Sequence, residues 1–353
     1  MGFFSTEFLS WLDDQAEAID QASGGPADQL LKRIAEEGTF HLALPRQVEE
    51  GKASQQDYIE ALAELAQHSL TAAFIAWGHG TFIDNILKTD NPYFREHYLD
   101  KILTADYAGA TGLSNAVKYL TNLEELNVEI VEEDGKLYLE GRLPWVTNLL
   151  ADHFLAVFAA GFSDGREPYV IAIPSEAAGL TRSEDLEFVS LQGANTAALI
   201  FDHVELKEEW ILSKTASAFL AQNRPTFLGY QLGMAFGLAE RSLAEVEKTL
   251  HHRNVLEEEW QEQLAALKGI QTRLYAGLAE EGYFVAHPRE LFQLRIDIVD
   301  VVAQSLLLEL QAGGGRGYFS QSQSGFIRRW REGAFLPIVS PSAVQLRHIL
   351  KAS

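Results

Sequence analysis

The sequence has no cysteine, and this absence excludes several kinds of chemistry. Disulfides, thiolate nucleophiles and cysteine-ligated zinc or iron–sulfur clusters all need that residue. The H-E-x-x-H, G-x-S-x-G and Walker patterns are missing as well. No apolar run reaches the roughly 18 residues that a membrane span requires, and no basic segment of a secretory signal begins the chain. We therefore expect a cytoplasmic protein with no metal site and no membrane span.

Basic residues are also scarce. The 28 Lys and Arg stand against 50 Asp and Glu, which gives a formal net charge of -22 in a chain of 353 residues. Such a surface repels phosphate backbones, so nucleic acid is not an expected partner. The same repulsion acts on an anionic thioester such as acyl-CoA, which would need a local basic patch. The acidic residues are spread along predicted helices, which indicates solvated helix faces.

The hydrophobic pattern predicts helices, then strands, then helices. Residues 55–88 have a helical pattern that we expect to be interrupted near Gly78-His79-Gly80. The predicted strands are residues 128–131 and 136–139 around Asp134-Gly135, 154–158 and 169–173 around Ser163-Asp164-Gly165, and then 186–189 and 197–201. Later helices are predicted over residues 225–252, 257–283, 287–312, 321–333 and 341–351.

Six segments carry a pattern that is informative because of its order along the chain. They are residues 37–45, 58–66, 140–152, 191–204, 314–318 and 328–332. The third contains Trp145-Val146-Thr147-Asn148 followed by Ala151-Asp152, and the fifth contains Gly314-Gly315. Together they resemble the acyl-CoA dehydrogenase superfamily over nearly the whole chain. The resemblance implies an α+β multidomain fold with an N-terminal helical domain (residues 1–104), a middle antiparallel β-domain (105–212) and a C-terminal four-helix bundle (213–353). It also implies a homo-oligomer, a tetramer or a dimer.

The resemblance implies a bound flavin, FAD or alternatively FMN. Trp145 would form a flat apolar wall, and Thr147 would donate a hydrogen bond near the flavin N5. Two residues that are two apart in a strand share a face, so both can meet one ring. Thr111, Gly112 and Ser114 lie where the family has a loop that cradles the pyrimidine ring and the phosphate side. There is a structural alternative for each set. Trp145 and Thr147 could belong to an ordinary β-strand with a core aromatic, and residues 111–114 could form an ordinary loop.

A second set of cofactor residues lies in the C-terminal part. Arg253 falls where the family has an arginine that reaches the flavin diphosphate of a neighbouring subunit, and the fork of donors on Arg suits that task. Gly314 and Gly315 match the family's GG.Gy pattern. The acidic residues 257–259 would repel a diphosphate, which keeps FMN open. The alternative for Arg253 is an ion pair with Glu257.

The glutamate that acts as the family's catalytic base has no counterpart in this sequence. Most members carry it where this chain reads Ile338-Val339-Ser340-Pro341, so Ser340 is the candidate catalytic residue at that place. Other members carry it on the first helix after the sheet, near Asn223-Arg224 here. Arg224 either binds a substrate anion or caps the bundle.

A subgroup of the same fold, similar to dibenzothiophene-type monooxygenases, takes reduced FMN from a partner reductase and often places a histidine over the flavin. Residues 76–80 are similar to that segment, so His79 could stabilise a flavin–oxygen adduct. The alternative is a buried, hydrogen-bonded histidine. Three functions therefore remain. They are flavin-dependent oxidation of an acyl thioester or related small molecule with an electron-transfer partner, monooxygenation with a flavin reductase, and ligand binding without turnover.

Overall fold

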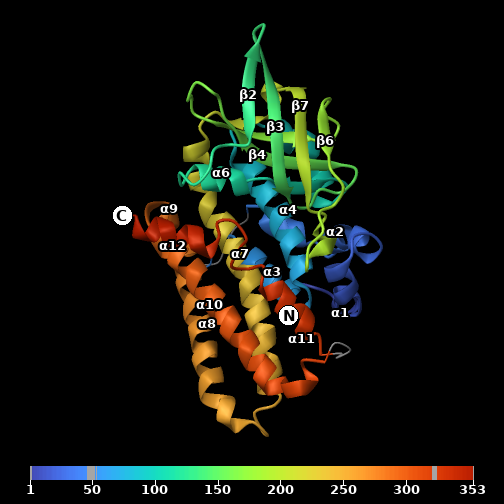
Figure 1. The fold of residues 1–353 in the computed structure, drawn as a ribbon, viewed down its shortest axis with the longest axis vertical. Coiled ribbons are helices and arrows are strands. Elements are labelled where there is room, and N and C mark those ends of the chain that lie inside the picture. Colours follow the sequence, from blue (N-terminus) through green and yellow to red (C-terminus); the bar gives the residue numbers. More distant parts are fainter. Residues whose placement is uncertain (1, 46–51, 53, 320–323, 353) are drawn as a thin grey trace.

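Two β-sheets lie at one end of an elongated molecule, and long helices form the other end (Figure 1). The computed structural model describes residues 2–45, 52, 54–319 and 324–352. The helices are α1 (Thr6–Gln21), α2 (Pro26–Glu36), α3 (Gln56–His68), α4 (Leu70–Lys88), α5 (Tyr93–Leu103), α6 (Ser114–Tyr119), α7 (Ala216–Glu247), α8 (Glu257–Ala279), α9 (Tyr283–Ala286), α10 (Pro288–Gly313), α11 (Phe326–Gly333) and α12 (Ala343–Lys351). The strands are β1 (Ala108–Thr111), β2 (Val128–Glu133), β3 (Lys136–Val146), β4 (Phe154–Ala160), β5 (Tyr169–Pro174), β6 (Leu180–Arg182), β7 (Ala197–Glu205) and β8 (Ile211–Ser213).

Several helices begin at side-chain caps that the sequence encodes. The Ser69 hydroxyl accepts from the Ala72 amide at the start of α4. At α12 the Ser342 hydroxyl accepts from the Gln345 amide while the Gln345 side chain accepts from the Ser342 amide, a reciprocal capping box. Each such cap satisfies amides that the helix leaves unpaired and contributes about 1 kcal/mol.

The two sheets have the strand orders β1-β4-β5-β8 and β2-β3-β7-β6. All strand pairs are antiparallel except β1 with β4. The β2–β3 hairpin turns through Asp134 and Gly135, both with positive φ, which is the conformation that Asp-Gly favours in tight hairpins. The β2–β3 and β4–β5 pairs confirm the two hairpins predicted from the sequence.

The strand predicted over residues 186–189 is wrong. This segment is irregular, and the short strand beside β7 is β6 instead. The apolar side chains that suggested a strand face outward, since Phe188 is 41% and Val189 is 79% exposed. The Phe188 ring lies 6.1 Å from the ring of Trp145 and so partly flanks it. The apolar side chains of residues 186–189 therefore belong to the surface and not to the core.

The interruption predicted near Gly78-His79-Gly80 is also wrong. Helix α4 is continuous through these residues, and the break falls between α3 and α4 at Ser69. Gly78 and Gly80 instead allow neighbouring residues to pack closely against α4. A Cβ at Gly80 would lie 2.4 Å from the Tyr58 hydroxyl, and one at Gly78 would lie 3.7 Å from the Thr111 methyl.

Helices α3 and α7 pack with their backbones nearly touching. A Cβ at Gly237 would lie 1.9 Å from the Ala63 carbonyl oxygen, and one at Gly233 would lie 2.7 Å from that of Ile59. Helix α7 begins well before the predicted residue 225 and contains Pro225 in its interior. The helical, β-rich and helical regions confirm the predicted fold class, and the exact domain bounds stay a prediction.

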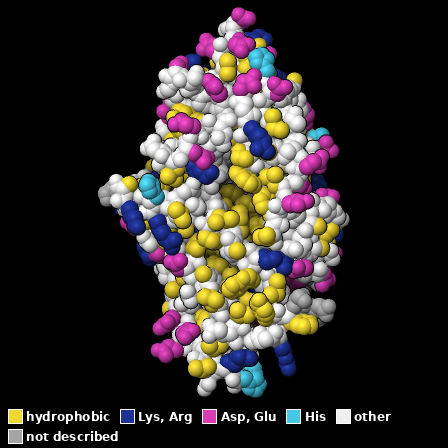
Figure 2. Space-filling model, in the orientation of Figure 1, with side chains coloured by type: hydrophobic (Ala, Val, Ile, Leu, Met, Phe, Trp, Pro, Cys, Tyr) yellow, Lys and Arg dark blue, Asp and Glu magenta, His cyan; other side chains and the backbone are white. Residues whose placement is uncertain are grey.

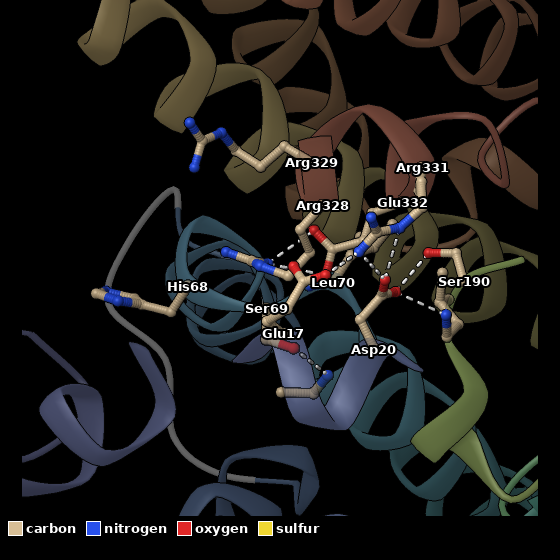
Figure 3. A network of polar contacts seen from close by, with 12 residues as sticks. Glu17, Asp20, His68, Ser69, Leu70, Ser190, Arg328, Arg329, Arg331 and Glu332 are labelled. Atoms are coloured by element: carbon tan, nitrogen blue, oxygen red, sulfur yellow. Dashed lines mark hydrogen bonds and ion pairs between the residues drawn. The ribbon is translucent and has the colours of Figure 1, made fainter. Parts of the chain in front are cut away.

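A network of buried charges joins α1, α4 and α11 (Figure 3). Asp20 accepts from the Arg331 guanidinium at 2.9 Å and from the Leu191 amide at 2.8 Å. On α11, Arg328 donates to both oxygens of Glu332 at 2.9 and 2.8 Å. The Leu70 amide donates to Glu332 at 3.0 Å. Both carboxylates are fully buried.

Candidate active site

A cavity of about 100 Å³ lies between the helices and the loop that follows β1. One water molecule needs about 10–15 Å³ of such cavity volume, so the cavity can hold several non-hydrogen atoms. Its lining residues are Thr81, Asp84, Asn85, Leu113, Val117, Leu120, Thr121, Leu220, Asn223, Arg224, Phe227, Leu228, Phe292, Pro341, Leu346 and Ile349. Most are apolar, and the polar ones cluster on α4 and α7. This composition is typical of a small-molecule site.

Two charged side chains line the cavity. Asp84 is the only carboxylate among its lining residues, and its side chain is 14% exposed. Burial raises the pKa of Asp84, while Lys88, whose Nζ lies 3.0 Å from its Oδ2, acts in the opposite direction. The Arg224 guanidinium lies 5.5 Å from the centroid of the Phe292 ring, and burial lowers its pKa. Within the described part of the chain, Arg224 forms no ion pair.

The predicted flavin residues of the β-domain lie next to α4. The Thr147 hydroxyl is 3.2 Å from that of Thr196, and the methyl groups of Thr147 and Thr111 both lie within 4 Å of the position of a Cβ at Gly78. The Thr111 hydroxyl is buried without a hydrogen-bond partner, while Trp145 is 53% exposed. An exposed aromatic side chain and an unsatisfied hydroxyl are groups that suit a flavin ring, which needs an apolar wall and a few polar contacts.

Ser114 and Ser340 meet at the edge of this region. Their hydroxyls lie 2.7 Å apart, and the Ser340 carbonyl accepts from the Gln231 side chain at 2.8 Å. Leu113 and Pro341, the neighbours of these serines, line the cavity. The loop predicted to bind the cofactor and the segment that lacks the family's glutamate are therefore in contact.

The Gly112 amide is paired within the sheet, and a role of this residue in the predicted cofactor loop stays a prediction. That amide donates to the Val157 carbonyl at 2.8 Å. A Cβ at Gly112 would lie 3.1 Å from a Leu143 methyl. Gly112 is thus a packing residue of the sheet.

Arg253, Gly314 and Gly315 lie at the opposite end of the molecule. Arg253 is in the loop between α7 and α8, and the glycines follow α10, both at the end remote from the sheets (Figure 1). Arg253 Nη1 donates to the Gln311 carbonyl at 3.0 Å, and its Nη2 would be 3.2 Å from a Cβ at Gly314. The alternative ion pair with Glu257 does not occur in the described residues. One chain alone cannot bring these residues to a ligand held at Thr147.

His79 has a structural environment that does not suit the catalytic role considered for it. It is fully buried and does not line the cavity. Its Nδ1 accepts from the Gly109 amide at 3.0 Å, so its Nε2 is protonated and donates to the Ile102 carbonyl at 2.8 Å. Both ring nitrogens are therefore occupied, and we do not retain His79 as a catalytic residue.

We expect the free energy of unfolding to fall by about 3 kcal/mol between pH 6.5 and pH 4 because of His79 alone. Burial lowers the pKa of His79 to about 4 from an ordinary 6.5. The unfolded chain takes up the proton as the pH falls through 6.5, whereas the folded chain does not until about 4. Denaturant unfolding at several pH values measures this. In His79→Gln, which cannot take up a proton, the fall should be smaller by that amount. An equal fall in both proteins would contradict the assignment.

Sequence reasoning predicted Arg224 but missed the polar residues that α4 contributes to the cavity, Thr81, Asp84 and Asn85. Together with Lys88 they recur at helical spacing in the otherwise apolar α4. This spacing places them on one face of the helix, and it was available in the sequence.

Apolar side chains gather on the face seen in Figure 2, and this face is hollowed near its centre. Among the described residues, no group of three metal-ligating side chains occurs and no helix is long and apolar enough to cross a membrane.

Comparison with known proteins finds several relatives, although no family model matches the chain. The chain is 25% identical over 240 residues to an acyl-CoA dehydrogenase of Bacillus subtilis, which covers 67% of this chain and 62% of the relative. It is 23% identical over 203 residues to the mitochondrial isovaleryl-CoA dehydrogenase of Arabidopsis thaliana, covering 56% of this chain and 49% of the relative. The chain thus matches only about half to three-fifths of the length of these two proteins.

Solved structures match the chain over nearly its whole length. A glutaryl-coenzyme A dehydrogenase complexed with glutaryl-CoA superposes with a TM-score of 0.80 at 15% identity, covering 99% of this chain and 95% of that one. An acyl-CoA dehydrogenase of Bacillus anthracis complexed with FAD superposes with a TM-score of 0.77 at 15% identity, covering 98% and 63%. FAD is the flavin of such neighbours, so FMN gains no support.

Two small sheets held against a frame of long helices define a helix–sheet–helix class of protein. The relatives in sequence and in structure say which known fold this is. This chain has the fold of the acyl-CoA dehydrogenase superfamily, a family of flavoprotein oxidoreductases.

Proposed function

We propose that this protein is an FAD-dependent oxidoreductase that oxidises a short acyl thioester. The observation that carries the proposal is the cavity, whose lining includes the neighbours of Ser114, in the predicted cofactor loop, and of Ser340. Leu113 and Pro341 line it, and the serines next to them hold each other by a hydrogen bond. A ligand in the cavity would therefore lie close to a flavin held by Trp145 and Thr147.

The chain's own residues have distinct tasks in this proposal. When bound, the flavin would supply the acceptor for a hydride from the β-carbon. Asp84, the carboxylate of the cavity, would take the α-proton, and its raised pKa brings it closer to that of an effective base. The apolar lining would exclude water, and Arg224 would place a positive charge beside the thioester. Ser340 cannot replace a carboxylate as base at neutral pH, and we propose that it orients Ser114.

The separation of the cofactor residues supports a proposal about assembly. Arg253 and Gly314 lie at the end of the molecule remote from Thr147 (Figure 1). We propose that they contact the flavin of a second copy of the chain, so that each site is completed by two chains. We also propose that the protein has an electron-transfer partner. The monooxygenase alternative depended on His79, whose ring nitrogens are both occupied.

The purified protein should bind FAD, and butyryl-CoA should bleach the flavin absorption in the absence of oxygen. Trp145→Ala should weaken FAD binding roughly ten-fold, because an exposed aromatic wall is removed. Flavin fluorescence titration measures the affinity. Trp330→Ala is the matched control, since Trp330 is another exposed tryptophan, on α11. Failure to bind FAD, or equal weakening by both variants, would contradict the flavin site.

A further inference from the structure

Two buried polar atoms around the cavity have no hydrogen-bond partner in the described structure. They are Asn223 Oδ1 and Thr81 Oγ1. Both residues line the cavity, and they are only 3% and 2% exposed. An unsatisfied buried polar atom costs about 1–3 kcal/mol, so such atoms need an explanation. A ligand that pairs with both would provide one.

The orientation of the Asn223 amide follows from a chain of hydrogen bonds. The Thr81 carbonyl can only accept, and it accepts from Asn85 Nδ2 at 2.8 Å. Asn85 Oδ1 must therefore be the acceptor on the other side of that amide, and it accepts from Asn223 Nδ2 at 2.9 Å. This leaves Asn223 Oδ1 as the unpaired atom, and an amide oxygen accepts hydrogen bonds but cannot donate one.

Thr81 adds a complementary requirement. Its hydroxyl can donate as well as accept, and it too is unpaired. A ligand hydroxyl matches either residue, because it can donate to the Asn223 oxygen or accept from the Thr81 hydroxyl. An ammonium group can only donate, so the proton of the Thr81 hydroxyl would stay unpaired. A methyl group would leave both atoms unpaired.

We propose that the cavity selects a short acyl group that carries a hydroxyl, which Asn223 and Thr81 bind. This inference rests on the proposed function and narrows its substrate class. The volume of about 100 Å³ suits a chain of a few carbons. The hydrogen bond to Asn85 fixes the orientation of the Asn223 amide. The site is therefore preorganised, and the amide need not reorient when the ligand binds.

The test compares butyryl-CoA with 3-hydroxybutyryl-CoA and 4-hydroxybutyryl-CoA by calorimetric titration of the FAD-loaded protein. At least one hydroxylated ester should bind roughly ten-fold more tightly than butyryl-CoA. Asn223→Leu removes the acceptor at similar size and should abolish this preference. Equal or weaker binding of both hydroxylated esters by the natural protein would overturn the proposal.

A second pair of variants tests the proposal independently, in case Asn223→Leu does not fold. Thr81→Val removes one hydroxyl in the cavity and should reduce the preference. Thr71→Val is its matched control, because Thr71 lies on the same helix with a buried, unpaired hydroxyl but does not line the cavity. A preference that survives Thr81→Val unchanged, or that Thr71→Val reduces equally, would overturn the proposal.

The failure of this inference is distinguishable from that of the proposed function. The same titrations are repeated with acyl groups on N-acetylcysteamine, which lacks the CoA phosphates. A hydroxyl preference without bleaching of the flavin by any ester would overturn only the proposed oxidation. Bleaching by butyryl-CoA and the hydroxylated esters with equal affinity would overturn only the hydroxyl selectivity.

Discussion

Asp84→Asn should reduce the rate at which an acyl thioester bleaches the flavin by a factor of about 10²–10⁴, the range typical for loss of a positioned base. The variant keeps the size and the polarity of the side chain but cannot accept the α-proton. FAD binding should be unchanged, because Asp84 lies on α4 among the residues that line the cavity and not among the predicted flavin residues. Anaerobic stopped-flow absorption measures the rate.

The dependence of this rate on pH separates a base from a structural residue. Burial raises the pKa of Asp84, so its active, ionised form is lost as the pH falls through a value above the usual range of an aspartate. The rate should fall with it, and Asp84→Glu should retain part of the rate with a shifted profile. Asp90→Asn, a change to an exposed aspartate near the end of α4, is the control. A rate in Asp84→Asn close to that of the natural protein would remove Asp84 from the mechanism.

Glu332→Ala should lower the free energy of unfolding by about 3–5 kcal/mol. The substitution leaves the Arg328 guanidinium buried without its carboxylate, and it removes the acceptor of the Leu70 amide at the start of α4 (Figure 3). Taking a charge out of water is costly, and only the paired carboxylate offsets that cost. Urea unfolding followed by circular dichroism measures the change.

Two further variants test whether the unpaired charge causes the loss of stability. Replacing both partners, Arg328→Leu with Glu332→Leu, should restore much of the stability, because no unpaired charge remains. Glu205→Ala breaks the exposed pair with Lys136 and should cost at most about 1 kcal/mol. If the double variant is as unstable as Glu332→Ala, then the loss comes from packing and the charge argument is wrong.

The sequence predicted the order of the regions because its periodicities are local. The Asp134-Gly135 hairpin and the helix that begins after Ser342 are set by residues close in the chain. The failures depend on distant partners. The glycines near His79 suggested a break because their contacts with Tyr58 and Thr111 are invisible in the sequence. Phe188 and Val189 suggested a strand because the sequence does not show that they lie on the surface.

The candidate site was predictable only in part. Thr147 and Trp145 stood out through their resemblance to a family, and their role stays a prediction. Asp84 and Asn223 did not, because nothing local distinguishes a buried polar residue that lines a cavity from one that packs in a core. Their roles follow from hydrogen bonds across α4 and α7, which only the fold brings together.

The contact between α3 and α7 affects how the chain folds during its synthesis on the ribosome. Helix α4 is buried on nearly all sides in the finished protein, and α7, one of its main neighbours, begins at Ala216. At about 5–20 residues per second, the intervening β-region takes on the order of ten seconds to synthesise. During that interval the apolar surfaces of α3 and α4 that later pack against α7 have no partner. We expect the nascent chain to depend on chaperones at this stage, and the β-region to fold before the helices on either side of it come together.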